Sequence, residues 1–347
     1  MTLGWLYWNP DRFIFTFPII DRPVAWYGLF FVIGFMIGYF IMTKMVFETL
    51  KQTQFLADRD IYNWTSLINS LKLQFPNFFS EKKISAENLN NQNKEIILQE
   101  VNDTLSQADP PFSRLNINKI FPKSIYSIQD LAVRYTDTLT WLIVLGTVIG
   151  ARLGHVFLYE WDRYKENPID IIKIWEGGLA SHGGTLGVIL ALIIFRRWTR
   201  NTFPEISFLS LLDNVCVPSA LVAFFIRIGN FFNQEILGTK SEMPWAIIFG
   251  NPSDGGGIYP RHPVQLYEAL CYLFTFLLLG WLWIHKREHL KQGFITGLFF
   301  VLTFGTRFFI EFYKVPMSSM MDESFLQTGQ ILSIPLIFSG IWLMIRR

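Results

Sequence analysis

Long uncharged stretches alternate with short polar connections along most of this chain. About twenty apolar residues cross the hydrocarbon core of a bilayer, and only structures that satisfy their own backbone hydrogen bonds, such as helices, can do so. The stretches are Val24–Thr43, Thr138–Ala151, Gly177–Phe195, Ile206–Ile226 (interrupted by Asp213), Ala269–Ile284, Gly293–Thr306 and Ser324–Ile345. We therefore predict an all-α polytopic membrane protein with seven transmembrane helices, at 24–46, 137–159, 178–197, 206–226, 264–284, 294–313 and 328–345.

Residues 51–136 break this pattern. They are polar, rich in Asn, Gln, Lys and Ser, and contain no run long enough to span a bilayer. An amphipathic helix is expected within residues 85–107, and its apolar side carries Ile96, Ile97, Val101 and Leu105. The segment is either a small accessory module or a partly disordered insertion.

The composition agrees with a membrane protein and removes other classes. Hydrophobic residues make up 51% of the chain and charged residues 17%, against about 25% in a typical soluble domain. The formal net charge of +2 creates no field that would recruit nucleic acid. Cys216 and Cys271 lie within apolar runs and provide neither a disulfide framework nor a zinc site. We therefore expect no nucleic-acid partner, no metal and no disulfide-stapled secreted protein.

Lysine and arginine in the short connections indicate how the helices are oriented. They flank one end of the predicted helices: Lys44, Lys51, Arg196, Arg197, Arg200, Lys286, Arg287, Lys291, Arg346 and Arg347. The positive-inside rule then places the N-terminus outside and the C-terminus in the cytoplasm. Residues 1–50 become an outer interfacial segment with the first helix, 51–136 a cytoplasmic insertion, and 137–347 the remaining helices with an outer loop at about 227–262.

Ionisable and amide side chains gather at the outer end of the predicted helices. Such groups are costly at membrane depth and usually mark function. They are Tyr27, Arg152, His155, His182, Arg227, Asn230, Asn233, Glu235, Arg261, His262, Gln265, Tyr267, Glu268, Arg307 and Glu311. Singly, each has a plain structural explanation, such as an interfacial tyrosine, a snorkelling arginine or an Arg307–Glu311 ion pair. Independent anchors would decorate both helix ends, so the joint pattern favours a pocket in which guanidinium groups bind an anionic phospholipid headgroup.

Two local segments sharpen this expectation. Ser181-His182-Gly183-Gly184 begins a helix, where glycines allow close approach and the helix N-terminus favours negative charge. The glycines also have an alternative use in helix packing. Residues 227–238, RIGNFFNQEILG, concentrate Arg, Asn and Glu directly outside a predicted span, which is typical of a binding loop rather than a helix.

These segments carry a resemblance to a known family. RIGNFFNQEILG resembles the signature of bacterial prolipoprotein diacylglyceryl transferases, and so do AWYG at 25–28, GARLGH at 150–155, GGLASHGG at 177–184, RHPVQLYE at 261–268 and GTRFFIEFYKVP at 305–316. The resemblance covers nearly the whole chain except 51–136, which departs from the family's shorter connection. It implies a multi-pass protein of the bacterial cytoplasmic membrane, with its active site toward the outer leaflet and no cofactor.

The resemblance also implies a reaction and its residues. The family moves the diacylglyceryl group of phosphatidylglycerol onto the thiol of the lipobox cysteine in a prolipoprotein signal peptide, forming a thioether and releasing glycerol phosphate. His182 is the leading base, with Glu235, Glu268 and Glu311 as rivals, while Arg227 and Arg307 hold the phosphate. Glu311 is also assigned to the catalytic group. The implied substrate-binding residues are Tyr27, Arg152, Gly183, Gly184, Asn230, Asn233, Glu235, Gly238, His262, Gln265, Tyr267 and Glu268. For Asp213, a structural role is at least as plausible.

Two other classes fit the sequence less well. A transporter would place polar groups along a path to both faces, often with internal repeats and a midplane site, and no such repeat is present. An intramembrane protease would need a His–Glu motif or paired aspartates within helices, and neither occurs.

Overall fold

The computed structural model describes residues 4–17, 22–52, 62–75, 89–107, 121, 123–158, 160–173, 178, 180–204, 206–315 and 326–346. The chain divides into two compact units. The larger comprises Met1–Met45 and Thr138–Arg347, and the smaller comprises Val46–Asp137.

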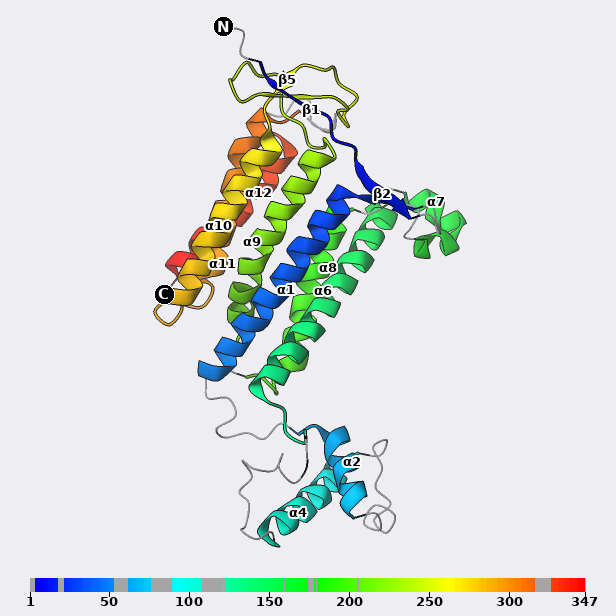
Figure 1. Ribbon diagram of the computed structural model, residues 1–347, viewed down its shortest axis with the longest axis vertical. Helices are drawn as coiled ribbons and strands as arrows, with labels where there is room; N and C mark the ends of the chain where they lie inside the picture. Colours follow the sequence, from blue (N-terminus) through cyan, green and yellow to red (C-terminus); the bar gives the residue numbers. More distant parts are fainter. Residues whose placement is uncertain are drawn as a thin grey trace. The chain divides into compact units, whose positions relative to one another are not determined.

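Long apolar helices make up most of the described chain (Figure 1). They are α1 (Trp26–Gln52), α6 (Ile128–Leu158), α8 (Ser181–Thr199), α9 (Phe208–Phe232), α10 (Val264–Lys286), α11 (Phe294–Ile310) and α12 (Thr328–Ile345). Among the described residues, 5 stretches are long and apolar enough to cross a membrane: Trp26–Gln52, Ile128–Phe157, Phe208–Phe232, Val264–Lys286 and Phe294–Tyr313. The chain is a mostly helical, polytopic membrane protein, in which α8 and α12 occupy the positions of two further predicted helices.

Three predicted helix ends were wrong. α1 continues to Gln52 instead of ending at 46, α6 begins at Ile128 instead of 137, and α9 continues to Phe232 instead of 226. Hydropathy marks the apolar part of a helix, whereas caps decide where the helix ends. At α6, for example, the Ser127 hydroxyl accepts from the Asp130 amide at 3.1 Å, and the Asp130 carboxylate accepts from the Ser127 amide at 3.2 Å.

Glycines set two close helix crossings in the larger unit. A Cβ at Gly150 of α6 would overlap the carbonyl oxygen of Gly183 on α8. In the same crossing, a Cβ at Gly187 of α8 would overlap the carbonyl oxygen of Gly146 on α6. Gly297 of α11 and Gly340 of α12 face each other in the same way. Small residues spaced four apart let helix backbones approach closely in membranes, where burial of apolar surface gives no driving force between helices.

A buried carboxylate joins α9 to α11. Oδ2 of Asp213 accepts from the Gly293 amide at 2.6 Å, and its Oδ1 accepts from the amide and hydroxyl of Thr296 at 2.8 Å and 2.7 Å. Because the first amides of a helix have no intrahelical partner, Asp213 caps α11 from the neighbouring helix. The structural role considered for Asp213 is therefore what the contacts show.

The sequence did not predict a small sheet formed by segments far apart in the chain. Strand β1 (Leu6–Trp8) pairs in parallel with β4 (Ile247–Phe249), which pairs with β5 (Pro260–Arg261) in the antiparallel sense. A separate hairpin, β2 (Phe13–Phe17) and β3 (Arg22–Ala25), leads into α1. The indole of Trp8 stacks on Phe231 with 4.6 Å between ring centroids, which fastens β1 to the end of α9.

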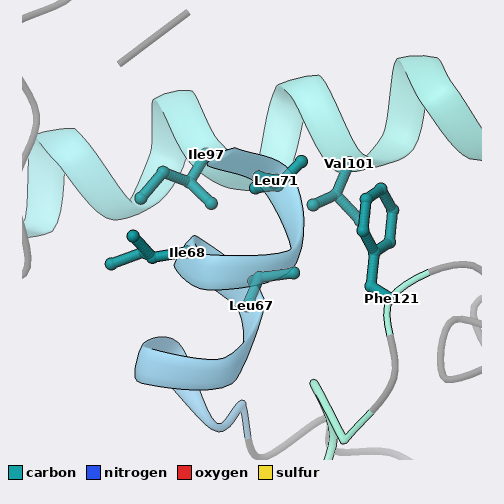
Figure 2. Packing of buried hydrophobic residues seen from close by; sticks show 6 residues of the cluster. All are labelled: Leu67, Ile68, Leu71, Ile97, Val101 and Phe121. Carbon is teal, nitrogen blue, oxygen red and sulfur yellow. The ribbon is translucent and has the colours of Figure 1, made fainter. Parts of the chain in front are cut away.

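The smaller unit has an apolar core of its own. Helices α2 (Trp64–Gln74) and α4 (Asn91–Gln107) contribute Leu67, Ile68, Leu71, Ile97 and Val101, and Phe121 completes the cluster (Figure 2). The amphipathic helix expected within 85–107 is α4, with Ile97 and Val101 on its buried side. The side chain of Leu105, which was expected on the same side, lies outside the described residues.

Candidate active site

The site begins at the last turns of α9. Arg227 lies one helical turn before Asn230, and its Nη1 donates to the Asn230 Oδ1 at 2.9 Å. Its Nε lies 2.9 Å from Oε2 of Glu268, a fully buried carboxylate in the first turns of α10. The expectation that this signature forms a loop from Arg227 onward was wrong, because Arg227 to Phe232 are helical and only the following residues leave the helix.

A lysine connects this ion pair to the end of α11. Nζ of Lys314 lies 2.9 Å from Oε1 of Glu268 and 2.9 Å from Oε2 of Glu311, which begins the short helix η4 (Glu311–Tyr313). Lys314 is 7% exposed, so both contacts are made away from bulk water. The described ion pairs of Glu311 include this lysine and not Arg307, although Arg307 and Glu311 lie four residues apart.

The residues after α9 turn back over the helix end. Nδ2 of Asn230 and of Asn233 donate to the two carboxylate oxygens of Glu235, at 3.2 Å and 3.0 Å. Nε2 of Gln265 on α10 donates to the Glu235 backbone oxygen at 2.7 Å. Gln234 and Ile236, on either side of Glu235, both have a left-handed backbone with φ of 55°. This bend directs the Glu235 carboxylate toward Asn230 of α9 and Asn233, which follows the helix.

Tyr27 and Arg307 border the same region. The ring of Tyr27 covers Gly229, where a Cβ would lie 2.8 Å from the tyrosine Cδ2. Tyr27 is within electrostatic range of both Arg227 and Glu235. The phenol of Tyr272 hydrogen-bonds with Arg227 and is within electrostatic range of Arg307, so both arginines lie near this phenol.

Two side-chain amide oxygens at the site have no donor among the described residues. Oε1 of Gln265 and Oδ1 of Asn233 are both buried, and no described group donates to either. Buried polar atoms are nearly always hydrogen-bonded, and an exception calls for an explanation. Asn233 and Gln265 both contact Glu235, which Asn230 links to Arg227, so the site has capacity for a ligand that carries both negative charge and hydroxyl donors.

A histidine and two tyrosines form the next layer. Nδ1 of His262 lies 3.2 Å from the hydroxyl of Tyr267, which accepts from Nε1 of Trp245 at 2.7 Å. The His262 ring packs edge to face with Tyr313, at 5.0 Å between centroids. Partial burial lowers the pKa of His262 from its ordinary value. His262 and Tyr267 thus adjoin Lys314 through the neighbouring Tyr313.

Arg152, predicted to bind the headgroup, is engaged elsewhere. It is buried, its Nε donates to the Ile171 carbonyl at 2.8 Å, and its Nη1 donates to the Gly178 carbonyl at 3.2 Å. Its Nη2 donates to the carbonyls of Asp170 and Lys173. These contacts hold the segment of α7 (Trp161–Glu166) and η2 (Pro168–Ile172), and Arg152 lies over the ring of Tyr164 at 5.1 Å.

The glycines of the predicted site have packing contacts. Gly183 lies in the crossing of α8 with α6. A Cβ added at Gly184 would lie 3.5 Å from the Cβ of Ala151, which is an ordinary contact distance. Gly238 forms a bridge with Lys314 and lies against the His262 carbonyl, so it helps to join the two signature segments. The side chain of His182, the predicted base, lies outside the described residues.

Lys314 and Gln234 were not predicted as site residues from the sequence. A signal for Lys314 existed, since Lys314 follows Glu311 by three residues and such pairs meet on one helical face. Its second contact, with Glu268, joins residues 46 apart and could not be read from spacing. For Gln234 no signal distinguished it from an ordinary polar loop residue.

The fold and the site together define a polytopic membrane protein with a buried arginine–carboxylate centre at one end of its helices. Residues 118–346 match the prolipoprotein diacylglyceryl transferase family. The chain is similar to a protein from Protochlamydia amoebophila named phosphatidylglycerol–prolipoprotein diacylglyceryl transferase, with 44% identity over 99% of this chain and 96% of the relative. This chain belongs to the prolipoprotein diacylglyceryl transferase family.

Two further relatives with the same name show which parts of the chain are shared. The protein from Tolumonas auensis is 44% identical over 64% of this chain and 82% of its own length. The protein from Chlamydia muridarum is 30% identical over 97% of this chain and 95% of its own length. Matches over 99% and 97% of the chain extend across residues 51–136, so the prediction that this segment departs from the family was wrong for these relatives.

Proposed function

We propose that this protein transfers the diacylglyceryl group of phosphatidylglycerol to the thiol of the lipobox cysteine of a prolipoprotein, forming a thioether and releasing glycerol phosphate. The relatives' names describe this substrate pair. The observation that carries the proposal is the buried centre of Arg227, Glu268 and Lys314 beside Arg307, with unmatched acceptors next to it.

The chemistry of the headgroup fits the groups around this centre. A phosphodiester carries one negative charge, and guanidinium groups bind its oxygens with paired hydrogen bonds. Among the described residues, the guanidinium of Arg227 has Asn230, Glu268 and Tyr272 as partners, and the guanidinium of Arg307 has no hydrogen-bond acceptor. The glycerol head has hydroxyl donors, and Oε1 of Gln265 and Oδ1 of Asn233 are buried acceptors without a donor.

The reaction needs a thiolate and a stabilised leaving group. The sulfur attacks the glyceryl carbon that bears the phosphate ester, the carbon–oxygen bond breaks, and glycerol phosphate leaves with the electron pair. Arg227 and Arg307 would stabilise the charge that grows on the leaving phosphate. The thiol proton goes to a base, because a free thiol has a pKa near 8.5.

His182 remains the proposed base, and Glu235 is its strongest rival among the carboxylates. The described contacts of Glu268 and Glu311 are with Lys314 and, for Glu268, Arg227. The Glu235 carboxylate is held by the amides of Asn230 and Asn233 instead. Glu235 is therefore the one of these three carboxylates whose described side-chain partners are neutral amides, which makes it the strongest rival to His182.

The transferase reaction has a direct test. Purified protein in phosphatidylglycerol nanodiscs is incubated with a lipobox peptide, and the peptide is analysed by mass spectrometry. We expect a diacylglyceryl mass increment on the cysteine, and none with phosphatidylcholine as the only lipid or with a Cys→Ser peptide. An unmodified peptide in the presence of phosphatidylglycerol would contradict the proposal.

The proposal includes seven spans, an outer N-terminus and a cytoplasmic insertion in the bacterial cytoplasmic membrane. The distribution of lysine and arginine supports this orientation. Asn91→Cys, in a background without Cys216 and Cys271, should resist membrane-impermeant thiol reagents in intact cells and react after permeabilisation. Labelling in intact cells would reverse the topology and with it the assignment of the site to the outer leaflet.

A further inference from the structure

Gln234 is fully buried, and every polar group it has is hydrogen-bonded. Its side-chain Nε2 donates to Oδ1 of Asn9 at 3.3 Å, and its side-chain Oε1 accepts from the backbone N–H of Asn251 at 2.7 Å. Its own amide donates to the Phe231 carbonyl at 3.2 Å, and its carbonyl accepts from the Ser253 amide at 3.0 Å. Four hydrogen bonds, to Asn9, to the segment of Asn251 and Ser253, and to the end of α9, fix the Gln234 side chain and its backbone in a single position.

The backbone at Gln234 is one that side chains disfavour. Its φ of 55° is left-handed, and Ile236 has the same value. A non-glycine residue in this region persists only where its surroundings hold it there, and such residues cluster at functional sites. The two left-handed residues enclose Glu235, whose amide donates to the Asn230 carbonyl at 2.9 Å. The bend therefore sets where the Glu235 carboxylate meets Asn230 and Asn233.

The partners that hold Gln234 come from two segments outside the candidate site. Asn9 follows β1, which is fastened to the end of α9 by the bond from Trp8 Nε1 to the Phe231 carbonyl at 3.1 Å. Asn251 follows β4, the strand that pairs with β1. The small sheet thus presents one side-chain acceptor and one backbone donor to the Gln234 amide.

We propose that Gln234 is a positioning residue of the headgroup site and that Asn9 is its side-chain partner. The inference rests on the proposed function, because the site it serves is the one assigned to phosphatidylglycerol. Gln234 acts through its neighbours. The hydrogen bonds of its side-chain amide hold the left-handed bend in place. The bend in turn holds Glu235 against Asn230 and Asn233, and Asn233 carries one of the unmatched acceptors. Loosening the bend should raise KM for phosphatidylglycerol more than it lowers kcat.

The hydrogen bond between Asn9 and Gln234 can be tested by exchanging its donor and acceptor. In Asn9→Asp, the carboxylate still accepts from Gln234 Nε2. In Gln234→Glu, the Asn9 amide can turn and donate to the new carboxylate. Each single variant should keep KM for phosphatidylglycerol within about threefold of the unchanged protein. In Asn9→Asp/Gln234→Glu two acceptors face each other, and KM should rise about tenfold, on the scale of couplings between contacting residues.

The double variant should also respond to pH in a characteristic way. Two facing carboxyl groups can share a proton at low pH but repel each other when both are ionised. The KM defect should therefore grow between pH 6 and pH 8.5, whereas the single variants should follow the unchanged protein. Gln234→Gly is a second variant in case the double variant does not fold, because glycine adopts the left-handed backbone readily but lacks the side-chain amide. It should show a similar rise in KM.

Asn214→Ala is the matched control. Asn214 is another buried amide on α9, and its Oδ1 accepts from Trp283 Nε1 at 2.9 Å near the opposite end of the helix. We expect this variant to lose thermal stability with KM unchanged. The inference would be overturned if the KM increase in the double variant equalled the product of the increases in the two single variants, or if KM were unchanged in Gln234→Gly.

A second readout is the rise in Tm on replacing phosphatidylcholine nanodiscs by phosphatidylglycerol nanodiscs. This rise should be smaller in the double variant than in the unchanged protein. It reports headgroup binding without the reaction, so failure of transfer by the unchanged protein would count against the proposed function alone.

Discussion

The two ends of α9 carry buried polar clusters of opposite character. At one end, three donors from Gly293 and Thr296 surround the Asp213 carboxylate at 2.6–2.8 Å. At the other end, Arg227 and Lys314 share the buried Glu268, and acceptors on Gln265 and Asn233 have no donor among the described residues. At 1.5 Å per residue, Asp213 and Arg227 are roughly 21 Å apart along the helix.

We interpret this difference as one between a structural cluster at Asp213 and the proposed headgroup site at Arg227. Burying a polar group is costly unless its hydrogen bonds are made. The Asp213 cluster meets that requirement within the fold, because it caps the orphan amides of α11. The Arg227 cluster meets it only in part, and the groups left over are those that a phosphate and a glycerol would satisfy. The burial of charge is common to both ends, so burial alone does not identify the site.

The largest effect is expected at Arg227. Arg227→Lys keeps a positive charge near Glu268 but cannot reproduce the planar fork that would contact both Asn230 and a phosphate. Loss of one donor to developing charge typically costs about 10²–10³-fold in rate. We expect a loss of this size in diacylglyceryl transfer, measured by mass spectrometry of the peptide, with membrane insertion intact.

Arg197→Lys is the matched control for this substitution, since Arg197 is exposed in the last turn of α8. It should transfer at the rate of the unchanged protein. Near-normal turnover by the Arg227→Lys protein would mean that a point charge suffices, and the two ends of α9 would then differ less than the contacts indicate.

The next effect concerns Lys314. Lys314→Met leaves Glu311 without its lysine and Glu268 with Arg227 alone, and removing one partner of a buried pair typically costs about 3–5 kcal/mol. We expect a comparable loss in the free energy of unfolding and a strong loss of transfer. Lys314→Arg, which retains the charge, should recover most of the stability. A Lys314→Met protein as stable as the unchanged one would show that the carboxylates do not depend on it.

Asp213 should show the reverse pattern. Asp213→Ala removes the cap of α11, and loss of a cap typically costs about 0.5–2 kcal/mol. We expect a lower Tm but an unchanged rate of transfer per folded molecule, because no group of the site contacts Asp213 in the described structure. Thr296→Val, which removes one of the three donors, should have a smaller effect in the same direction. A change in KM for phosphatidylglycerol in either variant would blur the distinction between the two clusters.

The sequence predicted the helices better than the contacts between them. Uncharged runs located α8, α10 and α12 closely, because apolar length is what a bilayer requires. Arg227, Glu268 and Glu311 were expected together because they share one end of the helices. The partners of Arg152 could not be predicted, since its donors bind backbone carbonyls of residues 18 to 26 positions away. The same holds for Gln234, whose amide meets Asn9 across 225 positions.

The smallest expected effect is a dependence of stability on the protonation of His262, which borders the Arg227 cluster. Partial burial beside Tyr267 and Tyr313 lowers the pKa of His262 below its ordinary value of 6.5. As pH falls, the unfolded chain therefore binds a proton at His262 before the folded protein does. The contribution of neutral His262 to folding stability is complete above the ordinary pKa, and it is lost as pH falls toward the pKa of the folded protein. We expect Tm to fall between pH 7.5 and pH 5.5, by less than the loss from Asp213→Ala at neutral pH. In His262→Gln this part of the decrease should disappear, whereas His285→Gln, on the exposed end of α10, should leave it unchanged. An identical pH profile for His262→Gln and the unchanged protein would assign the decrease to other groups and leave His262 with a packing role alone.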